Sequence, residues 1–304
     1  MANGAVWIDL LDPTEEELRA KASHDVEESA FALLLREHLH DDEPRPTIQG
    51  HGHYVFAVFL SAVDVDEEDL VYYQEIDVVL THRTVLTVRK TPPGRVPFDV
   101  EPLRRSVKAG DSGGMIVYRL VDEIAERYLD LVDDVDAEID ELEELVDQLS
   151  STEIRDRISG LRRDLLRIRR TLTPMRDAVR RVVDGVVEVK EGAEVFPHEV
   201  EIAFNSAYDK LLRATDGIDL TRDLLAGVRD YLQAKVANDQ NEVTKRLTVI
   251  AALLLLPTFI VGLYGQNFVD IPELRWRLGY AYVWGVIVVT SLMQILYFKR
   301  KRWI

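Results

Sequence analysis

A short polar segment between two long apolar runs carries the side chains with the clearest chemistry in this sequence. Gly265, Gln266 and Asn267 follow an apolar run that ends at Tyr264. Amide oxygens are neutral acceptors, so a ring of them could hold a cation through its water shell, which suits magnesium because this ion dehydrates reluctantly. We expect Asn267 to supply such a ring at a pore mouth, with Gly265 allowing close backbone approach. The alternative is a plain Gly-x-Asn turn at a helix end.

Six residues in and just before the preceding apolar run share one face of the predicted helix. Their spacings of 3, 4, 4, 3 and 4 residues align them in a stripe. Hydroxyls in the stripe could bind hydration waters, and leucines could form apolar constrictions that gate by dewetting. Lipid contact or helix packing would show the same periodicity, so the stripe alone leaves both readings open. The predicted pore-lining residues are Thr244, Leu247, Ala251, Leu255, Thr258 and Gly262.

The two apolar runs, Leu247–Tyr264 and Tyr280–Phe298, are the right length to cross a membrane. They hold 18 and 19 residues without a charged side chain, and as helices they span about 27–29 Å, close to one hydrocarbon thickness. Two buried core helices are the alternative. Pumps and proton-coupled carriers usually need an ionisable group inside a span. Passive flow is therefore the simpler mechanism, and a doubly charged ion gains about 4.6 kcal/mol per 100 mV, inside negative.

Basic residues flank both spans on the same predicted side. Lys245 and Arg246 precede the first span, whereas the loop Gly265–Gly279 balances two acidic residues against two arginines. The positive-inside rule therefore places both termini in the cytoplasm, with the protein in the inner (plasma) membrane. The basic group that follows the second span consists of Lys299, Arg300, Lys301 and Arg302.

Charge is distributed unevenly along the 304 residues. The chain carries a net charge of −17, and the segment from Thr244 to the end carries eight basic and two acidic residues, so subtracting +6 leaves −23 for residues 1–243. Such an acidic surface repels nucleic-acid phosphates and concentrates cations. The absence of cysteine excludes disulfides and thiolate metal sites. The first nine residues lack the pattern of a cleavable signal peptide.

The segments Tyr264-Gly265-Gln266-Asn267-Phe268 and Ile271-Pro272-Glu273-Leu274 resemble the signature of the CorA family of divalent metal cation channels. Methionine usually stands at the positions of Gln266 and Ile271. The resemblance is specific over about residues 200–304 and architectural before them, and the stripe aligns with the pore-lining face of the family. It implies a homo-oligomeric funnel, a pentamer, that takes up magnesium, with cobalt or nickel also possible cargo. Its partners are then copies of itself, the lipid bilayer and divalent cations, and it has no resident cofactor.

Two aspartates are candidates for cytosolic metal sensing. Asp209 belongs to Phe204-Asn205-Ser206-Ala207-Tyr208-Asp209, which resembles a family stretch with an aspartate where this chain has Ser206. That replacement puts magnesium-dependent closure by this route in doubt. Asp230 aligns with a second acidic position of the family.

The resemblance and the periodicities together predict an α+β cytosolic domain, arranged like an α/β/α sandwich, with a long helical stalk and two C-terminal transmembrane helices. Strand-like segments are Thr47–Ala62 and Gln74–Thr91, the latter a hairpin across His82-Arg83, and helical signals cover Glu15–Ala22 and Glu27–Leu39. The predicted division is a cytosolic domain 1–110, a helical hairpin 111–195, a stalk helix 196–246, spans 247–264 and 280–298 around an outer loop 265–279, and a tail 299–304.

The predicted hairpin has two helices of opposite charge. Asp130–Asp147 holds ten carboxylates and no Lys or Arg, and Glu153–Arg170 holds seven arginines. Ion pairing across the hairpin is the simpler reading, and surface pairs of this kind contribute little individually. Binding of cytosolic divalent ions by the surplus carboxylates is the alternative.

Two further function classes stay open at this stage. The ZntB branch, a close relative of CorA, would move zinc with or without protons. This alternative stays open because Gln266 departs from the methionine that is usual in the family. A membrane-anchored scaffold or signalling protein would use the hairpin to bind partners. The sequence contains no P-loop, nucleophile elbow or other catalytic constellation, so we do not expect an enzyme.

Overall fold

The computed structural model describes residues 4–22, 26–36, 43–65, 70–189, 194–266 and 271–303. The described chain forms two compact units, Met1–Arg229 and Asp230–Ile304. The elements in chain order are β1 (Val6–Leu11), α1 (Glu15–Lys21), α2 (Glu28–Leu34), β2 (Thr47–His51), β3 (Tyr54–Val65), β4 (Leu70–Leu80), β5 (Thr84–Lys90), α3 (Glu101–Ser106), α4 (Gly113–Leu145), α5 (Ser151–Val183), α6 (His198–Tyr264), the 3-10 helix η1 (Pro272–Arg275) and α7 (Gly279–Arg300).

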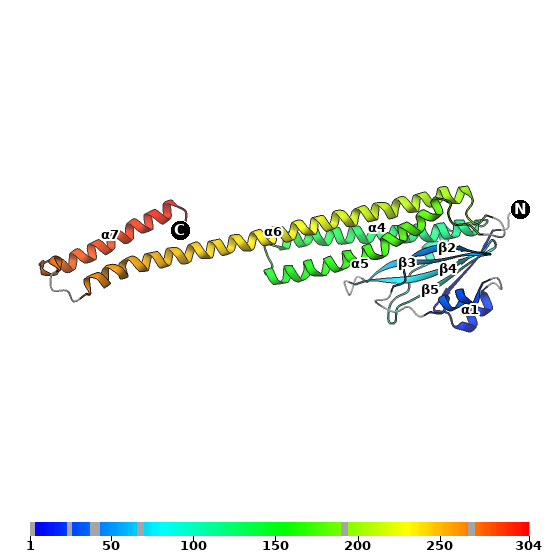
Figure 1. Ribbon diagram of the computed structural model, residues 1–304, viewed down its shortest axis with the longest axis horizontal. Helices are drawn as coiled ribbons and strands as arrows, with labels where there is room; N and C mark the ends of the chain where they lie inside the picture. Colours follow the sequence, from blue (N-terminus) through cyan, green and yellow to red (C-terminus); the bar gives the residue numbers. More distant parts are fainter. Residues whose placement is uncertain are drawn as a thin grey trace. The chain divides into compact units, whose positions relative to one another are not determined.

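The first unit is built on a five-stranded mixed sheet in the order β1-β5-β4-β3-β2. Strand β1 runs parallel to β5, and the other neighbours are antiparallel. In Figure 1, α1 lies on the opposite side of the sheet from α4 and α5. Because side chains alternate between the two faces of a strand, each layer of helices covers its own set of buried residues. This arrangement confirms the predicted α/β/α class.

Each face of the sheet has its own apolar contacts. Leu18 of α1 and Phe31 of α2 pack with Phe56, Val79 and Val88 in one cluster. On the other face α4 packs against β3, where the Tyr128 hydroxyl donates to the Leu60 carbonyl at 3.2 Å. The sheet is therefore covered on both sides within one chain.

Local signals explain where the short N-terminal helices begin and end. Thr14, which ends the helix-start sequence Asp12-Pro13-Thr14, caps α1 through a capping box with Glu17. Helix α2 ends at Leu34, earlier than the predicted Leu39, and residues 37–42 lie outside the described ranges. The Leu33 carbonyl near its end accepts a hydrogen bond from the Lys90 ammonium at 2.8 Å.

The predicted helical hairpin is present as α4 and α5. Ser150 caps α5 through a second capping box with Glu153. The apolar residues that recur every three or four positions along these two helices are nearly all buried, among them Leu142 and Ile154, both 0% exposed. Arg157 lies 3.6 Å from Glu138 and 3.7 Å from Glu141, so ion pairing does cross the hairpin.

Helix α6 runs unbroken for 67 residues, from the predicted stalk helix (196–246) through the first predicted span (247–264). Its soluble part packs on the hairpin: Lys210 pairs with Asp122 at 2.9 Å, and Arg169 pairs with Asp219 at 2.8 Å. Its C-terminal part and α7 are the two helices of the described chain that are long and apolar enough to cross a membrane. Only 11% and 6% of their most apolar windows are buried, which argues against core helices of a soluble protein.

Three details differ from the sequence-based expectation. Strand β1 was not foreseen, because a partly exposed edge strand of six residues has a weak pattern. The segment Thr47–Ala62 is two strands with a turn at Gly52-His53. The glycine-rich segment 110–114, whose composition predicts a linker turn, instead includes the first two residues of α4, and Gly114 packs closely there, since a Cβ on it would lie 2.5 Å from the Val195 carbonyl oxygen.

Candidate functional site: the α6 stripe and its outer loop

Helix α7 covers one face of α6 within the second unit. The buried residues of α6 on that side include Val249, 5% exposed, and Ile260, 7% exposed. The Gln294 side chain of α7 donates from Nε2 to the Ala252 carbonyl oxygen at 3.2 Å. At about 100° per residue these α6 positions centre on one side of the helix. The side that α7 occupies is therefore defined by packing as well as by a hydrogen bond.

The predicted stripe lies on the other side of α6. At about 100° per residue its centre is roughly 150° from the centre of the face that α7 covers. All six members, Thr244 to Gly262, are exposed in the single chain, and Leu247 and Leu255 are 62% and 71% exposed. Large apolar side chains flank the stripe, with Leu254 at 65% and Phe259 at 63% exposed. A face with hydroxyls and small side chains between apolar flanks is thus left uncovered by α7.

The threonine hydroxyls of the stripe have a defined hydrogen-bonding direction. Thr258 Oγ1 donates to the Leu254 carbonyl at 2.7 Å, and Thr244 Oγ1 donates to the Gln240 carbonyl at 2.8 Å. Since each hydroxyl proton is used by the helix, the oxygen offers only acceptor capacity outward. The waters around a metal cation direct their protons outward, so acceptors on the helix face match a hydrated cation.

A proline lies beside these hydroxyls. Pro257 is inside α6 and has no N–H, so the Leu253 carbonyl lacks its usual helical donor. Membrane helices tolerate such positions where neighbouring groups satisfy the freed backbone.

The outer loop is folded against the start of α7. Helix α6 ends with Gly265 N donating to Val261 O at 2.8 Å, and a Cβ on Gly265 would come within 3.0 Å of that same oxygen. Gln266 is exposed, and Asn267 lies outside the described residues. Gly279 is required where it stands, because a Cβ there would lie 2.0 Å from the Glu273 carbonyl oxygen. The chain is therefore closely packed at Gly265, after the end of α6, and at Gly279, at the start of α7.

The candidate sensing residues both lie on α6. Asp209 and Asp230 are exposed, as is Ser206. Phe204, five residues before Asp209, is fully buried and packs edge-on against Phe196, with the ring centroids 5.6 Å apart. Within the described ranges no group of three or more His, Asp or Glu side chains could hold a metal ion. A metal at either aspartate would need ligands beyond those that a single chain brings together.

The basic group at the C-terminus lies at the end of α7. Lys299 and Arg300 form its last turn, Lys301 is its C-cap, and Arg302 has a positive φ of 56°. All four side chains are exposed, while Phe298 beside them is 8% exposed and stacks on Trp303. The helix end is thus held by aromatic packing, with its charges directed outward.

One polar residue of the spans was missed by the reading of the sequence. Gln294 joins α7 to α6, and its Oε1 is buried with no hydrogen-bond partner among the described residues. An amide inside an apolar run is a signal that could have identified it, because a polar side chain in a span usually faces protein.

Comparisons with known proteins agree with this architecture. The family model described as "CorA-like Mg2+ transporter protein" matches residues 2–300. A cobalt/magnesium transport protein CorA from Thermotoga maritima is 30% identical over 278 residues, covering 89% of this chain and 76% of its own. A putative metal ion transporter, YfjQ of Bacillus subtilis, is 27% identical and covers 98% of this chain and 89% of its own. The complete CorA structure from Methanocaldococcus jannaschii superposes with a TM-score of 0.78 at 20% identity, over 98% of this chain and 91% of that one.

Proposed function

Because this chain belongs to the CorA-like Mg2+ transporter family, we propose that it is a passive, membrane-potential-driven channel for hydrated divalent cations, chiefly magnesium. Members of this family are transporters of the inner membrane and have neither catalytic activity nor a resident cofactor. The similarity to proteins named for cobalt and magnesium transport supports both ions as cargo. Nickel is a further candidate on chemical grounds, since it forms a similar hydrated divalent ion.

The single observation that carries the proposal is the stripe that α7 leaves uncovered. One pair of spans cannot enclose an ion path, so copies of α6 must bring their stripes together around an axis. Helix α7 would then lie outside this ring and face lipid. Five copies are proposed on the family resemblance. The exposed apolar flanks of the stripe, including Leu254 and Phe259, supply contact surface between neighbouring α6 helices.

Selection is proposed at the outer end of α6. Asn267 of each subunit would present an amide oxygen to the water shell of the ion, with Gln266 beside it and Gly265 setting the turn. Neutral acceptors bind the outward-pointing protons of hydration waters without competing for the metal itself. Carboxylates would instead favour partial dehydration, which magnesium resists.

Farther along the path, Thr258 and Thr244 would continue the row of acceptors, and Leu255 and Leu247 would form apolar constrictions. Ala251 and Gly262 leave room for a hydrated ion between them. No Asp, Glu, His, Lys or Arg occurs inside either span, so the membrane potential is a sufficient driving force at about 4.6 kcal/mol per 100 mV for a doubly charged ion.

Topology and regulation follow from the flanking charges. The basic residues at Lys245-Arg246 and at the end of α7 favour both termini in the cytoplasm. Asp209 and Asp230 are proposed to sense cytosolic metal between subunits. Ser206 weakens that site relative to the family pattern, so closure by magnesium would need higher ion concentrations or other ligands.

The proposal is tested by ion flux into liposomes that contain the purified protein, with magnesium, cobalt, nickel and zinc offered in turn. We expect magnesium uptake that depends on an inside-negative potential, and its loss in Asn267→Ala. Asn238→Ala, a matched change at an exposed position of α6, serves as the control and should transport normally.

Three outcomes would count against the proposal. Proton-driven uptake of zinc alone would favour a transporter like the ZntB branch. Unchanged flux in Asn267→Ala would show that Asn267 does not select the ion. A monomeric protein in the bilayer would show that copies of α6 do not form a pore. Absence of flux for every cation would favour the scaffold alternative.

A further inference from the structure

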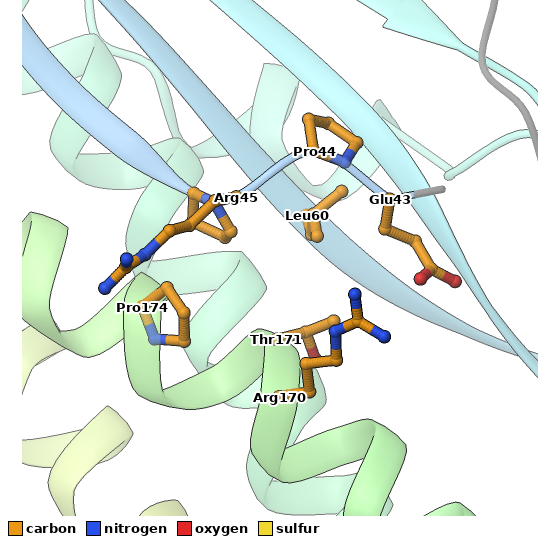
Figure 2. A pocket seen from close by; sticks show the side chains of 8 residues that line it. Glu43, Pro44, Arg45, Leu60, Arg170, Thr171 and Pro174 are labelled. Carbon is orange, nitrogen blue, oxygen red and sulfur yellow. The ribbon is translucent and has the colours of Figure 1, made fainter. Parts of the chain in front are cut away.

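A cavity of about 310 Å³ lies within the Met1–Arg229 unit, between the segment that leads into β2 and helix α5. Figure 2 shows side chains from both elements converging on it. None of the residues proposed to line the pore or to sense metal contributes to its wall. The cavity therefore needs an explanation of its own.

The charged groups of the cavity do not cancel. Arg167 beside it pairs with Glu43, with Nη2 3.0 Å from Oε1 and the Glu43 side chain only 10% exposed. This pair is neutral as a unit. Arg45 and Arg170 also line the cavity, and neither has an ion-pair or hydrogen-bond partner in the part of the chain that the structure describes. The wall therefore carries two uncompensated guanidinium groups.

An exposed arginine on α5 would by itself mean little. Arg155, Arg162 and Arg163 of the same helix are also exposed, and such side chains are usually just hydrated. Arg45 is different because it comes from another element, about 125 positions earlier in the chain, and the fold brings it to the same cavity as Arg170. The two guanidiniums flank the cavity in Figure 2, Arg45 on the side of Pro174 and Arg170 on the side of Glu43.

The rest of the wall is apolar and partly rigid. Leu60, 1% exposed, lies between the two arginines in Figure 2, with the ring of Pro44 beside it and the ring of Pro174 across the cavity on α5. Pro174 has no N–H, so the Arg170 carbonyl lacks its usual donor four residues later. Glu43 lines the cavity and adds a second carboxylate oxygen as an acceptor beside the positive groups. A ligand that is complementary to the groups lining this cavity has an anionic part, an apolar face and hydrogen-bond donors.

We propose that this cavity binds a nucleoside phosphate. Guanidinium groups bind phosphate with paired hydrogen bonds, and Arg suits this geometry better than Lys. The partly exposed rings of Pro44 and Pro174 offer an apolar surface for a planar base, and Glu43 can accept from a ribose hydroxyl or an exocyclic amine. A volume of about 310 Å³ lies in the range of small-molecule sites. An inorganic anion would use the arginines but leave the apolar wall and the acceptors unmatched.

The test is titration calorimetry on the purified full-length chain in detergent, with EDTA present so that metal binding by the nucleotide does not contribute heat. AMP, ADP, ATP, adenosine, inorganic phosphate and glycerol 3-phosphate are compared. We expect saturable binding of at least one nucleotide, with adenosine and the two simple phosphates at least about 10-fold weaker. Arg45→Ala and Arg170→Ala should each weaken nucleotide binding by about 10-fold, the usual effect of losing a charge-assisted hydrogen bond.

Arg163→Ala is the matched control, since it removes an exposed arginine of α5 outside the cavity, and its affinity should equal that of the unmodified chain. Thermal unfolding of all variants establishes that they are folded. Should Arg170→Ala unfold, Arg170→Lys takes its place, because it keeps the charge but loses the paired geometry, and it should still bind more weakly. No saturable binding up to about 10 mM, equal affinity for inorganic phosphate, or unchanged affinity in the Arg45→Ala, Arg170→Ala double variant would each overturn the proposal.

Discussion

The two units of the chain place their large apolar side chains in opposite environments. In Met1–Arg229 the large side chains of the sheet are inside, with Phe59 and Tyr72 both 0% exposed. In Asp230–Ile304 the corresponding side chains are outside, with Leu255 at 71% and Leu296 at 66% exposed. A soluble monomer rarely exposes so much contiguous apolar surface. The first unit buries an apolar core within one chain, whereas the second exposes the apolar side chains of two helices long enough to cross a membrane.

The two units also differ in the kind of polar group that they contain. The first unit buries ionic groups and pairs them inside the sheet: the Lys90 ammonium lies 2.6 Å from Glu75 Oε1 and 2.6 Å from Asp77 Oδ2. The second unit has no charge in its spans and keeps its polar groups as threonine hydroxyls and amides. Buried charges specify one arrangement of a folded domain, while neutral acceptors leave an ion path open to a passing cation.

The largest expected difference comes from truncating one apolar residue in each unit. Phe59→Ala should lower the free energy of unfolding by about 3–5 kcal/mol, because a fully buried ring is lost and a cavity is left. Leu255→Ala should cost less than about 1 kcal/mol, since its side chain packs little in its own chain. Denaturant unfolding in detergent measures both, and similar losses would mean that the second unit has its own core.

A smaller effect on the free energy of unfolding is expected from the protonation of Asp77, a buried carboxyl group of the sheet. Burial, followed by the neighbouring Glu75 carboxylate, raises the pKa of Asp77 from 3.8 to about 7, although Lys90 opposes the shift. The folded state then binds more protons than the unfolded state between about pH 4 and pH 7, so the free energy of unfolding falls as pH rises through this window. The slope reaches at most about 1.4 kcal/mol per pH unit.

Asp77→Asn should flatten this dependence, which unfolding measured at a series of pH values would reveal. Asp111→Asn is the comparison, because Asp111 pairs with Arg119 at 2.8 Å and its pKa is lowered rather than raised. An unchanged slope in Asp77→Asn would assign the pH dependence to other groups.

The smallest expected effect concerns the second unit alone. Thr258→Val removes one acceptor per subunit from the proposed path and keeps the shape of the side chain. We expect cation flux to fall by about 5-fold, as for the loss of one modest hydrogen bond, with no change in stability of the first unit. Thr258→Ser should restore flux. Equal flux in all three would place Thr258 away from the ion path.

The secondary structure of the membrane unit was predicted from the sequence more completely than that of the soluble unit. The spans, the long helix through Tyr264 and the stripe depend on composition and local periodicity, which a sequence states directly. The loop motif predicted the family from residues 200–304, and the family match extends it to residues 2–300. In the sheet, by contrast, the edge strand β1 was missed and two strands were read as one, since their register depends on partners far along the chain.

The sequence by itself determined the class of the protein: two uncharged spans, an amide-bearing loop between them and an acidic soluble part, because hydrophobic length and charge act locally. Only the tertiary structure decided which face of α6 is covered by α7. It also decided that Asp77 and Glu75 share one lysine, and that Arg45 and Arg170 meet at one cavity. Each of these depends on contacts between residues distant in the chain, and no local pattern specifies such contacts.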